Sequence, residues 1–150
     1  MKVILQRVTG ASVEVDGEII SSIEKGYLVL LGIGADDTKE QIDKMVEKIR
    51  KLRLFSDENG KTNLSIEDIK GEILVVSQFT LYADCKKGNR PSFTEAGNPV
   101  LAEELYNYFI EICKGGPCVS PFKKVGHGVF GAHMHVSLVN DGPFTVILNG

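Results

Sequence analysis

The segment Tyr27-Leu28-Val29-Leu30-Leu31 is an unbroken run of apolar side chains, and it is the clearest structural signal in this chain. A short apolar run without polar alternation is typical of a strand that is buried on both faces. A second run, Ile73-Leu74-Val75-Val76, has the same character and leads directly into polar side chains that begin at Ser77. We therefore expect two strands that expose neither face to solvent.

Two helices are predicted beside these strands. Thr38 and Gln41 form a capping box, and the apolar residues 42, 45, 46, 49 and 52 that follow make one stripe of a helix. Asn98, as N-cap, and Pro99, at the first helical position, predict the start of a second helix. Its expected inner face is Ala102, Leu105, Phe109 and Ile112, and its expected end is Gly115-Gly116-Pro117.

Shorter strands complete the predicted fold. Asp16-Gly17 is typical of a two-residue type I′ hairpin turn, and Asn140-Asp141-Gly142-Pro143 predicts a second turn. About seven strands with two unevenly interleaved helices indicate one α+β domain over residues 1–150, with a mixed, strongly curved sheet. The further strands expected are Val3–Val8, Val13–Val15, Glu18–Ile20, His133–Val139 and Phe144–Leu148.

Composition excludes several classes of protein. The 150 residues are 43% hydrophobic and 25% charged, which argues against a disordered or fibrous chain. No apolar run approaches the ~20 residues of a membrane span, and the N-terminus turns polar too early for a signal peptide. Three cysteines, Cys85, Cys113 and Cys118, form no C-x-x-C pair, so we expect a protein of the reducing cytoplasm without a disulfide framework.

The charge distribution allows limited contact with nucleic acid. A formal net charge of −3 argues against a general nucleic-acid coat. Lys86, Lys87 and Arg90 nevertheless cluster in the polar segment 84–99, which predicts a loop. Such a cluster can hold a few phosphates, although a solvated surface is the more common explanation of clustered charges.

Three familiar site patterns receive little support. Gly32-Ile33-Gly34 follows a strand, but Asp37 stands where a dinucleotide-binding loop needs its third glycine. His133 and His135 alternate on one face of a predicted strand, and no third metal ligand has suitable spacing in the sequence, although His127 or Cys85 could approach the pair in space. A triad built from Ser77, Asp84 and a histidine has no local support, because these residue types are common.

Two segments carry stronger evidence of a site. In Ser77-Gln78-Phe79-Thr80-Leu81 a buried strand changes abruptly to hydroxyl and amide side chains, and strand ends are where open sheets place their ligands. Asn140-Asp141-Gly142-Pro143-Phe144-Thr145 is either an ordinary turn or a rigid element that presents main-chain carbonyls, especially if its X-Pro bond is cis.

Together these two segments resemble the D-aminoacyl-tRNA deacylases, formerly called D-tyrosyl-tRNA deacylases. The resemblance runs from end to end, and it includes Gln6-Arg7-Val8 with Ala11-Ser12-Val13, Lys87–Phe93, and Gly131-Ala132-His133-Met134. It implies a curved, barrel-like mixed sheet with two main flanking helices. It also implies a cytosolic homodimer that uses no cofactor or metal. The implied reaction is hydrolysis of the ester that joins a D-amino acid, or mischarged glycine, to the 3′ end of tRNA.

The family also implies roles for individual residues. A cis Gly142-Pro143 pair would reach into the partner's active site, where it would reject the side chain of an L-amino acid and admit a D-amino acid or glycine. Backbone N–H groups of Phe79 and Thr80 are the expected oxyanion donors. We expect Thr80 to position substrate rather than act as nucleophile, with water activated by the ribose 2′-hydroxyl, Gln78 orienting the ribose or water, and Ser77 supporting the site. The residues expected to bind substrate or tRNA are Arg7, Lys87, Arg90, Met134 and Asn140.

The sequence is also compatible with two other functions, and it departs from the family pattern at three residues. A relative that binds nucleic acid without catalysis is one alternative, and a metal hydrolase built on His133 and His135 is another. Phe144 stands where many relatives carry a smaller β-branched residue, and His133 and His135 stand where other polar residues are expected. Neither departure touches the centre of the two motifs, so we still expect activity.

Overall fold

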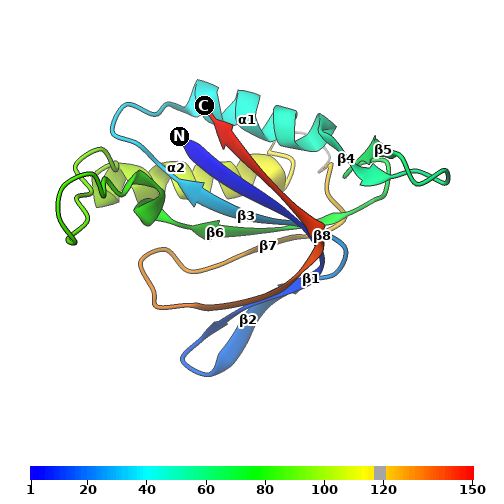
Figure 1. The fold of residues 1–150 in the computed structure, drawn as a ribbon, viewed down its shortest axis with the longest axis horizontal. Coiled ribbons are helices and arrows are strands. Elements are labelled where there is room, and N and C mark those ends of the chain that lie inside the picture. Colours follow the sequence, from blue (N-terminus) through cyan, green and yellow to red (C-terminus); the bar gives the residue numbers. More distant parts are fainter. Residues whose placement is uncertain (117–120) are drawn as a thin grey trace.

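The computed structural model describes residues 1–116 and 121–150. Within these residues a six-stranded mixed sheet has the order β2-β1-β3-β6-β7, and β8 pairs with the other edge of β1 (Figure 1). The chain ends lie close together, because the Gly150 N–H donates to the Met1 carbonyl at 2.9 Å. The six strands are β1 (Lys2–Val15), β2 (Glu18–Ile23), β3 (Gly26–Gly32), β6 (Glu72–Ser77), β7 (Val125–His127) and β8 (His135–Asn149).

The two apolar runs form the adjacent parallel strands β3 and β6, in the register Tyr27 to Ile73 and Leu31 to Ser77. Tyr27 packs in the larger of two apolar clusters, which lies under the helices, whereas its neighbour Leu28 belongs to the smaller cluster on the opposite side. Successive side chains of a strand point to opposite faces, so an apolar run is required where both faces are covered. The prediction of two strands buried on both faces is confirmed.

Both predicted helices are present and cover the same face of the sheet (Figure 1). α1 (Lys39–Lys51) begins with the Thr38–Gln41 capping box, and α2 (Pro99–Cys113) begins with Asn98 as its N-cap. A Lys39–Glu104 ion pair at 2.7 Å links the helices at their exposed sides. The inner face of α2 is wider than predicted, because Tyr106, Ile110 and Cys113 are also buried while Ile112 is only partly so.

The curved sheet is nearly closed, as the barrel-like prediction requires. Val8 and Val13 of β1, Leu74 of β6 and other apolar residues fill its interior in the smaller cluster. β7 approaches β2 closely, since a Cβ on Gly126 would lie 2.4 Å from the Ser21 hydroxyl oxygen. A curved mixed sheet with two flanking helices is therefore confirmed. No helix in the described residues is long and apolar enough to cross a membrane.

Several predicted strand boundaries are wrong. The N-terminal strand is continuous from Lys2 to Val15, and the C-terminal strand runs unbroken from His135 to Asn149 instead of turning at Asn140–Pro143. Four residues of β8, 141–144, oppose the single residue Arg7, so turn-like sequence forms a bulge inside one long strand.

Other elements were not predicted. The loop at residues 57–60 joins a hairpin of β4 (Arg53–Ser56) and β5 (Thr62–Ser65), and β6 is followed by a 3-10 turn, η1 (Phe79–Tyr82). Asp16 and Gly17 both have positive φ, as the predicted type I′ turn requires. α2 ends at Cys113, while Pro117 and Cys118 lie outside the described residues.

Candidate active site

A pocket of about 490 Å³ lies where β6 ends, beside the start of α2. Ser77, Gln78 and Phe79 form one wall, and Met134 and His133 form part of another. The remaining lining residues are mostly apolar or small, so a few polar groups face an otherwise apolar space. They are Val76, Ala96, Gly97, Pro99, Ala102, Phe130, Gly131, Ala132 and Val136.

The change from strand to turn at Gln78 positions the polar groups of the first motif. The Gln78 N–H donates to the Leu31 carbonyl at 2.8 Å and extends the pairing of β3 with β6 by one residue. The Gln78 side-chain amide donates to the Thr80 hydroxyl. This bond is the one that Thr80 Oγ1 makes within the described residues, and no histidine or carboxylate contacts it there. The hydroxyl is thus held by Gln78, and no side chain that could act as its general base contacts it within the described residues.

The backbone at the start of η1 offers unpaired donors. Within the part of the chain that the structure describes, neither the Phe79 N–H nor the Thr80 N–H has a hydrogen-bond acceptor. The Phe79 side chain beside them is 57% exposed, and its ring meets Phe93 edge to face with 5.1 Å between centroids. Phe79 lines the pocket and Thr80 follows it without lining the pocket itself, and two adjacent free N–H groups beside a pocket can stabilise a developing oxyanion.

The second motif lies outside this pocket. Gly142 and Pro143 are exposed in the bulge of β8, and their peptide bond is cis, as expected. Asn140 braces the bulge, because its side chain accepts from the Phe144 N–H at 2.6 Å and donates to the Thr145 hydroxyl at 3.0 Å. The pocket and the Gly142-Pro143 segment of one chain are therefore separate surfaces.

Arg7 also belongs to the bulge rather than to the pocket. Its guanidinium donates to the Asp141 carbonyl at 2.9 Å and to the Leu54 carbonyl of β4 at 2.7 Å, and it lies 4.6 Å from the centre of the Phe144 ring. The side chain is 11% exposed. Arg7 thus holds residues 141–144 in place through these contacts. Contact of Arg7 or Asn140 with RNA stays a prediction.

The remaining predicted site residues, Lys87 and Arg90, lie in one exposed loop. This loop follows η1, and its ends are joined by paired Asp84–Ser92 backbone hydrogen bonds of 2.8 and 3.0 Å. The Asp84 carboxylate accepts from the Lys86 N–H and does not line the pocket, so the Ser77–Asp84–histidine triad is not assembled. The described residues contain no group of three or more potential metal ligands.

His133, which lines the pocket, contacts His135, which does not. Their rings meet edge to face with 5.2 Å between centroids. His135 Nδ1 lies 3.8 Å from a carboxylate oxygen of Glu14 on the neighbouring strand. Both side chains are exposed, so they form a rim rather than a buried centre.

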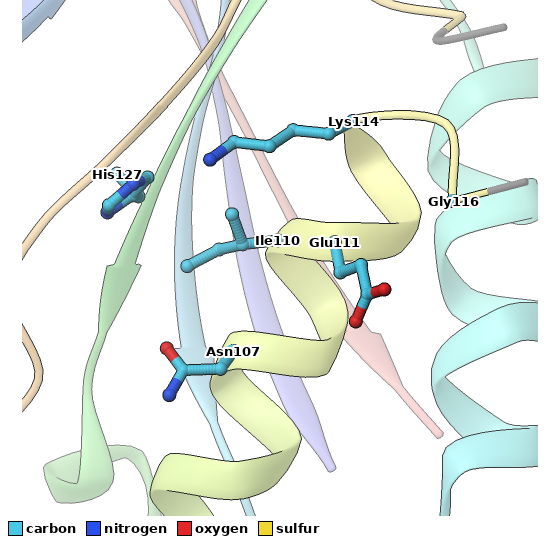
Figure 2. Close-up of a pocket in the computed structure, with 6 residues that line it drawn as sticks. All are labelled: Asn107, Ile110, Glu111, Lys114, Gly116 and His127. Atoms are coloured by element: carbon cyan, nitrogen blue, oxygen red, sulfur yellow. The ribbon is translucent and has the colours of Figure 1, made fainter.

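A second groove, of about 360 Å³, runs beside the C-terminal end of α2 (Figure 2). Figure 2 shows Lys114 extended toward His127 above Ile110, whereas Glu111 is directed to the opposite side of the helix. No residue that the sequence predicted for the site lines this groove. The pocket beside Ser77 is therefore the candidate active site.

Sequence reasoning missed part of the pocket wall. Phe130 contributes its aromatic side chain, and Ala96 and Gly97 contribute mostly main-chain surface. None of the three has a reactive or hydrogen-bonding side-chain group that would indicate a functional site. Gly97 must also be small, because a Cβ there would lie 2.9 Å from the Gly34 carbonyl oxygen. The one signal available was the concentration of small residues in two loops.

Comparison with known proteins agrees with these features. The family model described as D-Tyr-tRNA(Tyr) deacylase matches residues 4–149. A curated D-aminoacyl-tRNA deacylase of Thermosipho africanus (strain TCF52B) is 55% identical over 149 residues, which are 99% of this chain and 97% of that protein.

Two solved structures are similar over nearly their whole length. One, named c-Myc DNA Unwinding Element Binding Protein, has a TM-score of 0.92 at 46% identity and covers 100% of this chain and 99% of its own. The other, described as a probable eukaryotic D-amino acid tRNA deacylase, has a TM-score of 0.83 at 18% identity, covers 98% and 97% of the two chains, and shows the shared fold. The chain therefore belongs to the D-Tyr-tRNA(Tyr) deacylase family and is an enzyme of the D-aminoacyl-tRNA deacylase kind.

Proposed function

We propose that this protein hydrolyses the ester of D-aminoacyl-tRNA in the pocket beside Ser77, Gln78 and Phe79. The observation that carries the proposal is the pair of unpaired N–H groups of Phe79, which lines that pocket, and of Thr80, the next residue along the chain. Hydrolysis of an ester passes through a tetrahedral intermediate whose oxygen becomes negative, and fixed N–H donors stabilise that charge without reorganising.

The chemistry needs few other groups from the protein. Water attacks the ester carbonyl carbon, the bond to the ribose 3′ oxygen breaks, and a proton from the water ends on that oxygen. The neighbouring ribose 2′-hydroxyl assists the proton transfer, which accounts for a site without a histidine or carboxylate next to Thr80. Gln78 and Thr80 hold each other and orient the ribose or the water.

In this proposal, L-amino acids are rejected by the Gly142-Pro143 segment of a second copy of the chain. Gly142 and Pro143 lie outside their own pocket, on a fifteen-residue strand that pairs with β1 alone among the described strands. Val139 and Ile147 of this strand are 63% and 67% exposed, which supports burial against a partner. In the resulting homodimer the partner's Gly142 and Pro143 carbonyls obstruct an L side chain, and glycine, which has no side chain, is also accepted.

Purified protein is tested on matched D- and L-tyrosyl-tRNA in the presence of EDTA. Release of tyrosine from the D substrate alone is expected, because the chiral filter obstructs an L side chain. The release should persist in EDTA, because the proposed site uses no metal ligand. Release from both substrates would contradict the chiral filter, and release that EDTA abolishes would contradict metal-independent hydrolysis. A dimer mass by light scattering tests the assembly. We place this activity in the cytoplasm, with the tRNA.

Thr80→Val is expected to slow hydrolysis of D-tyrosyl-tRNA about tenfold without abolishing it, which corresponds to ~1.4 kcal/mol in the barrier. Valine keeps the shape and the backbone N–H but removes the hydroxyl that accepts from Gln78. Single-turnover kinetics measures the effect, and Thr62→Val in β5 is the matched control. Complete loss of activity, with an acyl-enzyme trapped in the wild type, would instead identify Thr80 as the nucleophile.

Lys87 and Arg90 are expected to make the affinity for tRNA depend only weakly on salt concentration, because they contact few phosphates. Each phosphate contact to single-stranded RNA contributes about 0.7 to the slope of log affinity against log salt. Lys87→Ala and Arg90→Ala should each raise KM for D-tyrosyl-tRNA and lower the slope by about that amount. Lys61→Ala, in the exposed hairpin after β4, is the control. Unchanged slopes in both loop variants would remove these residues from the RNA-binding surface.

Binding of DNA without catalysis is the second candidate, because a structure 46% identical to this chain is named as a DNA unwinding element binding protein. Fluorescence anisotropy with single-stranded DNA, compared with uncharged tRNA, tests it. Tight DNA binding together with no release of D-tyrosine would favour this candidate over the deacylase.

A further inference from the structure

The turn η1, which carries the candidate oxyanion donors, lies at an exposed position directly after β6. None of its residues, Phe79 to Tyr82, is buried. Its backbone bonds at either end are Leu81 N–H to the Gln78 carbonyl at 3.3 Å and Ala83 N–H to the Thr80 carbonyl at 3.0 Å. Both are local, so they shape the turn without fixing where the turn lies on the sheet.

Lys2 supplies a long-range contact to this turn. Its ammonium donates to the Leu81 carbonyl at 3.2 Å and lies 4.5 Å from the centre of the Tyr82 ring. A cation near an aromatic face and a charge-assisted hydrogen bond are both stronger than a neutral contact. Lys2 itself is fixed in β1, where it pairs with Gly32 of β3 and Asn149 of β8.

Gly32-Ile33-Gly34 forms the surface on which the turn rests. A Cβ on Gly32 would lie 3.0 Å from the Gln78 carbonyl oxygen and 3.1 Å from the Leu81 Cβ. A Cβ on Gly34 would lie 2.6 Å from the Tyr82 hydroxyl oxygen. These glycines thus let the turn approach β3 closely, which is a structural use for a motif that resembled an incomplete dinucleotide loop.

We infer that Lys2 and Tyr82 are positioning residues that hold η1 against Gly32 and Gly34, and thereby hold the Phe79 and Thr80 N–H groups in register with the pocket. The inference rests on the proposed function for its catalytic consequence. Lys2 touches the carbonyl end of the turn, and the two free N–H groups lie at the opposite end. A shift of the turn therefore moves the donors without removing them.

Lys2→Met tests the inference, because methionine keeps the length of the side chain and loses the charge. We expect kcat for D-tyrosyl-tRNA to fall about tenfold, with KM changed less than about twofold and with little change in Tm. Lys2→Arg should restore kcat to within about threefold, since it keeps both the cation and the donor. Lys44→Met, an exposed lysine of α1, is the matched control.

Tyr82→Leu should also lower kcat, and the double variant with Lys2→Met should lose less than the sum of the two single losses, because both changes remove the contact between the Lys2 ammonium and the Tyr82 ring. Unchanged kcat in Lys2→Met, an equal loss in Lys44→Met, or failure of Lys2→Arg to restore activity would each overturn the inference. Additive losses in the double variant would do the same.

Amide hydrogen exchange separates this inference from the proposed function. Peptides covering residues 78–83 should exchange faster in Lys2→Met than in wild type, while peptides from α1 stay unchanged. Faster exchange in a protein whose wild type releases no D-tyrosine would support the contact and reject the deacylase. Unchanged exchange at residues 78–83 would overturn the contact whatever the activity.

Discussion

Gly142→Ala is expected to reduce the preference for D- over L-tyrosyl-tRNA by at least about tenfold, which is a loss of ~1.4 kcal/mol in discrimination. Hydrolysis of the D substrate should stay within about threefold of wild type, because the role proposed for Gly142 in the partner's pocket is to obstruct an L side chain, and Gly142 supplies none of the groups proposed for hydrolysis. The variant therefore separates stereochemical selection from catalysis.

The physical reason is a local shift of the bulge. Gly142 has φ of +145°, a backbone conformation that L side chains rarely adopt. A Cβ there would lie 2.9 Å from the Phe144 nitrogen and 3.4 Å from a terminal guanidinium nitrogen of Arg7. Residues 141–144 must then move, and the carbonyls of Gly142 and Pro143 move with them.

Release rates from the matched D and L substrates measure this effect. Gly17→Ala is the control, because Gly17 also has positive φ but lies in the β1–β2 turn with nothing within 4 Å of its Cβ position. Full discrimination in a folded, dimeric Gly142→Ala protein would contradict the chiral filter.

Gly26→Ala is expected to lower the free energy of unfolding by about 4 kcal/mol or more, a loss that few single substitutions cause. A Cβ on Gly26 would lie 1.8 Å from the Glu72 carbonyl oxygen, which is main chain and cannot rotate away. Gly26 pairs with Glu72 at the start of the parallel ladder between β3 and β6, so the ladder must open at that end.

Urea unfolding measures this loss, and the melting temperature should fall by roughly 10 °C. Gly10→Ala is the matched control on β1, because its Cβ would meet only the Ile23 carbonyl oxygen, at an ordinary 3.5 Å. If the free energy of unfolding of Gly26→Ala lies within about 1 kcal/mol of the wild-type value, close approach of β3 and β6 at this point is not essential to the fold.

The elements that could be predicted from sequence are those with a local signal. The runs at Tyr27–Leu31 and Ile73–Val76, and the caps at Thr38 and Asn98, each place their cause within a few residues. β7 has three residues and forms by parallel pairing with β6, a distant partner, so it leaves no pattern of its own. The bulge in β8 was read as a turn because Asn140–Pro143 has the composition of one.

In the candidate site, too, features with a local sequence signal could be predicted, and features that depend on distant partners could not. The switch from apolar to polar side chains at Ser77 marks a strand end, and that strand end does line the pocket. The contact of Arg7 with substrate stays a prediction, and the structure adds two acceptors for its guanidinium, the carbonyls of Leu54 and Asp141, that the sequence did not indicate. Leu54 and Asp141 are 47 and 134 residues from Arg7 along the chain, and partners at such separations cannot be predicted from the side chain itself. Lys2 and Tyr82 were missed for the same reason.

The pairing of β1 with β8 has a consequence for how the protein reaches its native state. Lys2 pairs with Asn149 and Glu14 with His135, so nearly the whole chain separates the partners in sequence. Contacts of such long range form slowly, because the intervening chain must first be brought together. During synthesis β1 therefore presents one unpaired edge until residues 135–149 have emerged, and in that interval the nascent chain is most exposed to mispairing with other chains and depends most on protection by chaperones.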